Sequence, residues 1–230
     1  PGNMVLSVAG RVDVPKLLSD VEVFTKNWPQ AMPPARRFSG EAKAIGRQFL
    51  QIPQANQQYI LQLAPGPSAM DPDRYAARLA AMIFGDDTGS RLFWRLVDSG
   101  KADLAAVGHY EYDSTGVLMS MLGMRPEDAA EVWSEFEALE EEFLQQPPTE
   151  HELKLAKAKA IASLSSANEI SENRMFDIGS QWLTYGYYLS VEQVVELYRR
   201  VTLQDILKVT QRFPMQQKQV LAIGPDAMAW

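Results

Sequence analysis

The sequence predicts an α+β fold in which an antiparallel sheet is covered on one face by helices. Strand-like segments occur mainly in the first half of the chain and helical segments in the second, and hairpin turns join some of the strands. With 230 residues, 46% of them hydrophobic and 22% charged, the chain has the composition of one soluble globular domain with a buried core.

The first two elements are a short strand and a helix. Residues 3–9 have the composition of a buried strand, and residues 13–28 have the spacing of a helix that tolerates Pro15 in its first turn. Proline and glycine then interrupt all periodicity in residues 28–40, as is typical of a linker.

Four further strands are predicted before the helical part of the chain begins. They cover about 43–51, 57–64, 103–112 and 116–123, and the tight turn "DSTG" joins the last two. In the second of them Tyr59, Leu61 and Leu63 alternate with Gln58 and Gln62, which predicts a sheet with one covered face. Between these two pairs, Asp71 and Pro72 are expected to begin a helix that buries a stripe of Tyr75, Leu79, Met82 and Ile83.

The second half is mostly helical. One helix is marked by Val132, Phe136 and Phe143, and a capping box at Thr149 to Glu152 opens the next. A third helix is expected over about 171–185, Ser190 caps a fourth, and Thr202 begins the last, before the terminal strand "QVLAIG".

The first and last strands resemble each other, because "NMVLSVAG" and "KQVLAIGP" are the same kind of strand ending in glycine. Two similar halves would explain this repeat. The predicted organisation is therefore a strand and helix left over from a preceding domain (1–30), a linker (31–42) and a C-terminal domain (43–230). The start at Pro1 fits either a processed Met-Pro terminus or a fragment.

Composition excludes several classes of function. A net charge of −7 gives no basic surface for nucleic acid, and the absence of cysteine excludes a disulfide framework, a cysteine nucleophile and a cysteine zinc site. No apolar run is long enough to span a membrane. Cytoplasm and periplasm both remain open as locations.

Two motifs come close to a chemical signature and fail. "GDDTGSRL" at residues 85–92 lacks the glycine spacing and lysine of a phosphate-binding loop, so Asp87 or Thr88 is expected to cap a helix instead. "HELKL" at residues 151–155 has Leu155 where a zinc-binding H-E-x-x-H motif needs its second histidine. The residues therefore predict no catalytic group and no metal ligand in this chain.

One strand face is a candidate ligand-lining surface. On the strand 103–112, His109 and Glu111 share one face with Val107, while Tyr110 lies on the other. The face of His109 is expected to be open, toward water or toward a ligand.

Residues 85–124, from "GDDTGSRLFWRLVDSG" to "MSMLGM", resemble the pitrilysin, insulinase and mitochondrial processing peptidase family of zinc metallopeptidases. The flanks agree: "TEHELKLAKAKAIASL" resembles a helix of that family, "LSVEQVVELYRRVTLQDILKVTQRF" resembles its closing segment, and residues 3–29 resemble the end of its first domain. The resemblance covers nearly the whole chain and implies the C-terminal, non-zinc-binding half-domain of such a protein.

The resemblance also implies a function and partners. Two similar domains would close around a peptide-holding chamber, with zinc bound by the missing N-terminal half or by a homologous partner subunit. The family pattern places an arginine and a tyrosine after "SRLF", but this chain has Val97 at the first position and Leu104 or Ala105 at the second. The substrate-contact candidates are instead Arg91, Arg95, His109, Tyr110 and Glu111. The alternative is an inactive, protease-derived module that assembles with a partner subunit.

Overall fold

The computed structural model describes residues 4–29, 46–216 and 218–225. Its contacts divide the chain into two compact units, Pro1–Glu41 with Ile161–Val195 and Ala42–Ala160 with Glu196–Trp230. The predicted linker at 31–42 lies outside the described residues, and the predicted domain boundaries stay a prediction.

The larger unit is built on a five-stranded sheet with the order β1-β5-β2-β4-β3. The strands are β1 (Gly46–Gln51), β2 (Gln58–Gly66), β3 (Leu104–Glu111), β4 (Gly116–Met124) and β5 (Gln219–Gly224). The predicted α+β class is confirmed, and β3 and β4 form the predicted hairpin. One pair departs from the prediction, because β1 joins β5 in parallel while all other pairs are antiparallel.

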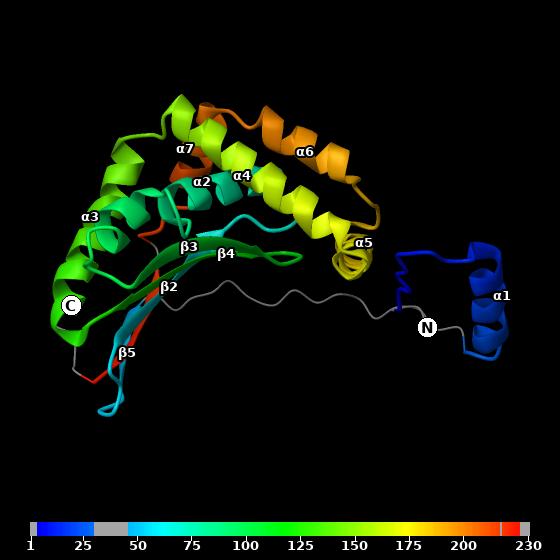
Figure 1. Ribbon diagram of the computed structural model, residues 1–230, viewed down its shortest axis with the longest axis horizontal. Helices are drawn as coiled ribbons and strands as arrows, with labels where there is room; N and C mark the ends of the chain where they lie inside the picture. Colours follow the sequence, from blue (N-terminus) through cyan, green and yellow to red (C-terminus); the bar gives the residue numbers. More distant parts are fainter. Residues whose placement is uncertain (1–3, 30–45, 217, 226–230) are drawn as a thin grey trace. The chain divides into compact units, whose positions relative to one another are not determined.

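Helices of this unit cover one face of the sheet (Figure 1). They are α2 (Arg74–Gly85), α3 (Ala129–Gln145) and α7 (Leu203–Arg212), together with the first half of α4 (Glu150–Glu169). The core lies between these helices and the sheet, where Phe84, Val132, Phe136 and Ile206 are at most 1% exposed. Two short turns, η1 (Phe93–Val97) and η2 (Pro126–Asp128), connect the layers.

Polar contacts fix the ends of the helices. The predicted capping box at Thr149 forms, and Thr202, which was predicted only to begin the last helix, also forms one; in each, the hydroxyl accepts the backbone N–H three residues on. The turn before η1 differs from the prediction, because Ser90 rather than Asp87 or Thr88 accepts the free N–H of Phe93. The start of α2 also differs, since the helix begins at Arg74 and Asp71 accepts the N–H of Asp73 in the preceding turn.

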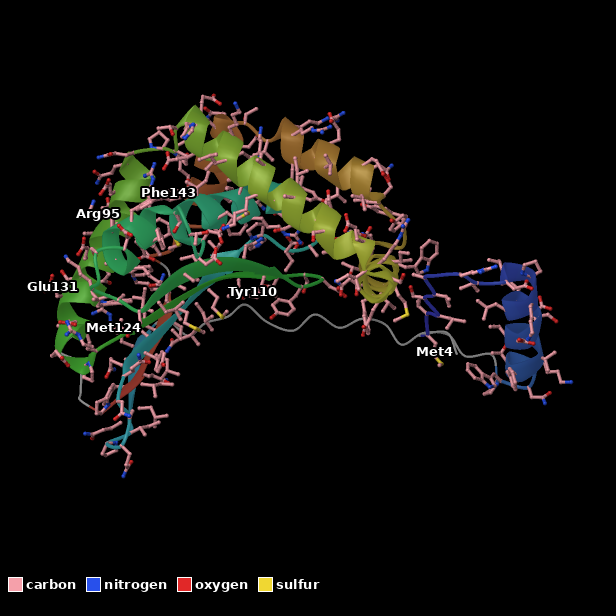
Figure 2. All side chains as sticks on the ribbon, in the orientation of Figure 1. Met4, Arg95, Tyr110, Met124, Glu131 and Phe143 are labelled. Carbon is pink, nitrogen blue, oxygen red and sulfur yellow. The ribbon has the colours of Figure 1, made fainter. Side chains whose placement is uncertain are left out.

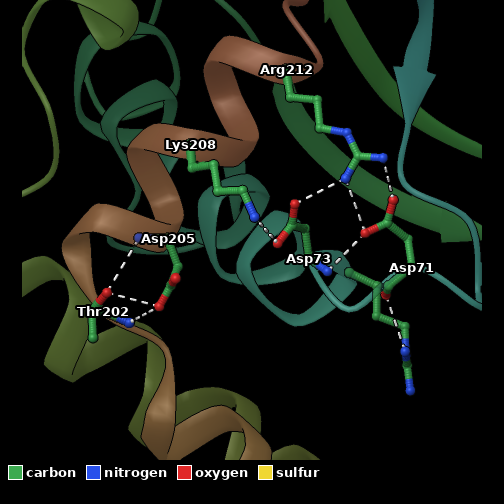
Figure 3. Close-up of polar contacts among 7 residues, drawn as sticks. Asp71, Asp73, Thr202, Asp205, Lys208 and Arg212 are labelled. Atoms are coloured by element: carbon green, nitrogen blue, oxygen red, sulfur yellow. Dashed lines mark hydrogen bonds and ion pairs between the residues drawn. The ribbon is translucent and has the colours of Figure 1, made fainter.

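An ion network joins the start of α2 to α7 (Figure 3). Arg212 pairs with both Asp71, at 2.8 Å, and Asp73, at 3.0 Å, while Lys208 lies 3.1 Å from Asp73. The two carboxylates are about one-tenth exposed, whereas both cations are half exposed or more. This network holds α7 beside α2 from outside the core.

The smaller unit contains α1 (Val14–Thr25), the second half of α4, α5 (Ser171–Tyr185) and the start of α6 (Val191–Arg200). The predicted helix at 13–28 forms as α1, and the Asp13 side chain caps it by accepting the backbone N–H of Lys16. The predicted strand at 3–9 is wrong for its described part: residues 4–9 pair with no strand of the described chain, and Ser7 instead donates a hydrogen bond to the Met175 carbonyl. A strand needs a neighbour for its backbone groups, and the local pattern does not supply one.

Candidate functional site

The helix-free face of the sheet is more apolar than such a face usually is, although the covered face also contains core residues such as Ile60 and Ala64. In β2, Gln58 and Gln62 are each 1% exposed beneath the helices, whereas Tyr59 and Leu63 are 44% and 39% exposed on the other side. An antiparallel sheet with one solvated face normally presents polar residues there. The helix-free face of this sheet is therefore the first candidate for a binding surface.

Strand register shows that the helix-free face is mostly apolar, with Gln48 and Gln219 as its polar side chains. Leu63 lies opposite Met119 and Gln219, and Leu61 lies opposite Met121 and Leu221. Among the described strands this surface, called the open face below, contains no charged side chain. Its apolar members are Leu50, Tyr59, Leu61, Leu63, Pro65, Leu104, Ala106, Tyr110, Val117, Met119, Met121, Leu221 and Ile223.

Two tyrosines lie flat on the open face. A Cβ atom at Gly123, the register partner of Tyr59, would lie 3.1 Å from the Tyr59 ring, and one at Gly108 would lie 2.9 Å from the Tyr110 ring. Each ring therefore occupies the space above a glycine. Tyr110 projects from the side of the sheet away from α2 and α3 (Figure 2). The open face consequently combines broad aromatic surfaces with the flexible side chains of Met119 and Met121.

His109 and Glu111 do not lie on an open surface, and this part of the sequence prediction is wrong. The His109 side chain is fully buried and that of Glu111 is 7% exposed, on the face that α2 covers. Arg78 of α2 lies 2.6 Å from Glu111, and Arg74 lies 4.0 Å from it. These two cations compensate the buried carboxylate, which explains how a polar strand face can lie beneath a helix.

One contact of His109 places a hydrogen on its Nε2 atom. Its Nε2 lies 2.9 Å from the Pro67 carbonyl, which can only accept, so Nε2 carries the hydrogen. Burial lowers the pKa of His109 below its ordinary value, although the Pro67 contact and Glu111 act in the other direction. His109 thus holds the end of β3 against the chain that follows β2, on the side away from the open face.

Arg91 also makes structural contacts within the domain. Its guanidinium forms a two-pronged contact with Glu152, at 2.8 and 3.2 Å, and donates to the Gln146 carbonyl at 3.0 Å. The central guanidinium carbon of Arg91, Cζ, lies 5.1 Å from the centre of the Phe143 ring. Arg91 therefore ties the turn before η1 to the start of α4.

Acid should weaken this tie. Partial burial acts to raise the pKa of Glu152, but hydrogen bonds from Arg91 and Thr149 outweigh it and lower the pKa to about 2. Because this value lies below that of an unfolded glutamate, the stabilisation is complete above about pH 4.5 and is lost as the pH falls toward 2. Urea unfolding across this range should show that Glu152→Gln loses about 1–2 kcal/mol less stability on acidification than the original protein.

The matched control is Glu150→Gln, an exposed glutamate in the same first turn of α4. It should keep the acid sensitivity of the original protein. An equal acid response in the Glu152 and Glu150 variants would show that the Arg91 contact does not contribute.

Arg95 and the two altered family positions lie around the start of β3. Arg95 is 53% exposed and lies 3.4 Å from Glu135 and 3.7 Å from Glu142 of α3. Val97 ends the π-helical turn η1, in which Asp98 donates to the Phe93 carbonyl. Of the two residues that could occupy the tyrosine position, Leu104 lies on the open face and Ala105 is buried on the other.

The described residues do not fit a zinc site. Among them, no group of three or more histidine, aspartate or glutamate side chains is arranged to hold a metal ion. His109 is occupied by the Pro67 carbonyl, and the second ligand position after His151 is Leu155. In the same described ranges, no helix combines the length and apolar composition needed to cross a membrane.

Comparison with known proteins agrees with this arrangement. The model of the peptidase M16 inactive domain matches residues 1–160. A protein from Rickettsia bellii named "Uncharacterized zinc protease" is 27% identical over 99% of this chain, which spans 55% of that relative. The chain thus spans about half the length of the curated relatives that it matches.

Solved structures share the fold. A peptidase M16 inactive domain from Pseudomonas fluorescens superimposes with a TM-score of 0.83 at 19% identity, covering 96% of this chain and 53% of the other. A chain of Complex III2 from Candida albicans superimposes with a TM-score of 0.80 at 18% identity, covering 94% and 54%. These findings confirm the family resemblance found in the sequence, and the chain belongs to the peptidase M16 inactive domain family.

Proposed function

We propose that this domain forms one wall of a peptide-holding chamber and that an extended peptide contacts its open face. The observation that carries the proposal is the exposure of Tyr59, Leu63, Tyr110 and Met121, each at least 39% exposed on a face with no charged side chain among the described strands. Exposed apolar surface of this extent is typical of a binding site. A peptide that lies across the sheet or pairs with its edge strand β3 would contact Tyr110 and Leu104 in either position.

The other wall and the zinc ion are proposed to belong to a paired N-terminal peptidase half. An M16 inactive domain implies such a half, and the curated relatives are about twice as long as the matched region. In the smaller unit, Met4, Leu6, Leu18 and Phe24 are 59–78% exposed. We propose that this segment and α1 complete the preceding domain, where those side chains would be buried. Peptide hydrolysis would then require the zinc-binding half, and this chain alone would have none.

Of the sequence-based contact candidates, Tyr110 is retained in this proposal. It lies on the open face, whereas His109 and Glu111 are buried on the opposite face and Arg91 is held by Glu152. Arg95 belongs to the helix layer through Glu135 and Glu142. A phenol on β3 can donate a hydrogen bond to a peptide carbonyl, which Leu104 at the family's tyrosine position cannot do.

A binding measurement with single substitutions tests the wall. A labelled, permanently unfolded polypeptide should bind this chain, and Leu63→Lys should weaken binding at least about tenfold, because a charge on the wall would have to be desolvated. The matched control is Leu155→Lys, the same change at a side chain 56% exposed on α4. Equal binding by the Leu63 and Leu155 variants, or no binding by the original chain, would contradict the proposal.

The second candidate is an assembly module that pairs with a partner subunit. It is favoured by Val97 in place of the family's arginine and Leu104 or Ala105 in place of its tyrosine, and by the fold shared with a chain of Complex III2. Elemental analysis distinguishes the two candidates. Stoichiometric zinc in the longest native product of the gene, with this chain as the blank, supports the chamber, whereas a metal-free product supports assembly.

A further inference from the structure

The open face differs from the rest of the molecule in its charge. Charged residues make up 22% of the chain, but none lies on the open face among the described strands, where Gln48 and Gln219 are the polar exceptions. The helix-covered face holds the buried ion pairs of Glu111 instead. A charged side chain pressed against the open face would therefore lose water without gaining a counter-ion.

In an extended peptide, the exclusion of charged side chains from the open face applies only to alternate residues. Successive side chains of an extended chain point to opposite sides, and those on one side are about 7 Å apart. A peptide lying on the open face thus presents every second side chain to it. The residues between them point away from the wall and are free to carry charge.

The side chains at the centre of the face accept different shapes. Met119 and Met121 lie in neighbouring rows with Leu63 and Leu61 as their partners on β2. Methionine adapts to varied partners, and the flat rings of Tyr59 and Tyr110 offer aromatic surface at two ends of the face. Such a wall discriminates weakly among apolar side chains and strongly against charge.

We propose that the open face selects extended polypeptides in which one row of alternate side chains is uncharged and apolar or aromatic. This inference rests on the proposed function, because it names the substrate class of the same wall. The ligand of the open face is an extended peptide, because an uncharged row of side chains matches the uncharged face.

Two peptides of identical composition test the inference. Both contain the same leucines, serines and glutamates over about nine residues, roughly 30 Å when extended. In the first, all glutamates share one row of alternate positions and the other row is leucine only. In the second, each row contains a glutamate. Anisotropy of the labelled peptides should show that this chain binds the first at least about tenfold more tightly.

A variant that introduces a positive charge gives an independent readout. Met119→Lys places an ammonium group in the centre of the open face, and it should reduce or invert the preference by strengthening binding of the second peptide. Circular dichroism and the urea midpoint should stay close to those of the original chain, because this side chain projects from the open face. If the variant does not fold, the preference of the original chain decides the question.

The possible results distinguish a failure of the proposed peptide preference from a failure of the proposed peptide-binding wall. Equal binding of both peptides, weakened alike by Leu63→Lys, would overturn the substrate class and leave the wall in place. No binding of either peptide would overturn both. A dimer by light scattering that Leu63→Lys dissociates would assign the open face to a second copy of the chain and overturn the inference.

Discussion

Replacing Glu111 by glutamine is expected to lower the free energy of unfolding by about 3 kcal/mol. Glu111 is buried and lies 2.6 Å from Arg78, with Arg74 at 4.0 Å. Removing its charge takes away an anion that lies beside Arg78 and Arg74, and the side chain of Arg74 is only 9% exposed. Urea unfolding followed by circular dichroism measures the loss.

The control is Glu196→Gln, which removes the same charge from an exposed pair with Arg200. That change should cost less than about 0.5 kcal/mol. Adding Arg78→Met to Glu111→Gln should cost less than the sum of the single effects, since the two residues share one contact. Full additivity would show that the buried pair does not exist.

The change Gly116→Ala is expected to destabilise the domain by at least about 3 kcal/mol or to prevent folding. A Cβ atom at this position would lie 1.9 Å from the Pro67 carbonyl oxygen and 2.9 Å from that of Gly66. These are backbone atoms at the paired ends of β2 and β4, so they cannot move aside without breaking the ladder. The urea midpoint of the purified variant, or its failure to accumulate as soluble protein, measures the effect.

The matched control is Gly46→Ala in β1, where the nearest atom to an added Cβ is the Gln219 side-chain oxygen at 3.7 Å. Its effect should stay within about 1 kcal/mol. Similar stabilities for the Gly116 and Gly46 variants would contradict the close approach of the two strand ends.

Local patterns were sufficient to predict most of the elements. The hairpin of β3 and β4 and the capping box at Thr149 depend on residues near one another in the sequence, and both form. The segment 4–9 shows the limit of such patterns, because its apolar residues predict a strand whose pairing partner the described chain does not contain.

The side of the sheet that the helices cover could not be predicted in the same way. In β2 and β3 the polar residues Gln58, Gln62, His109 and Glu111 all lie on the covered side, and the burial of Glu111 depends on Arg74 and Arg78, more than thirty residues away in sequence. Of the residues on the open face, the sequence predicts a contact role for Tyr110 only. Leu63, Met119 and Met121 were missed, although their alternation along two strands was visible, because only the register brings those strands together.

Methionine methyl NMR tests the open face as the peptide-binding wall most directly. The chain has ten methionines, of which Met119 and Met121 lie on the open face, while Met124 and Met215 are buried and serve as internal controls. Titration with the peptide that has one all-leucine row should shift or broaden the signals of Met119 and Met121 and leave Met124 and Met215 unchanged. Changes confined to methionines elsewhere in the chain, such as Met70 or Met175, would contradict the proposed wall.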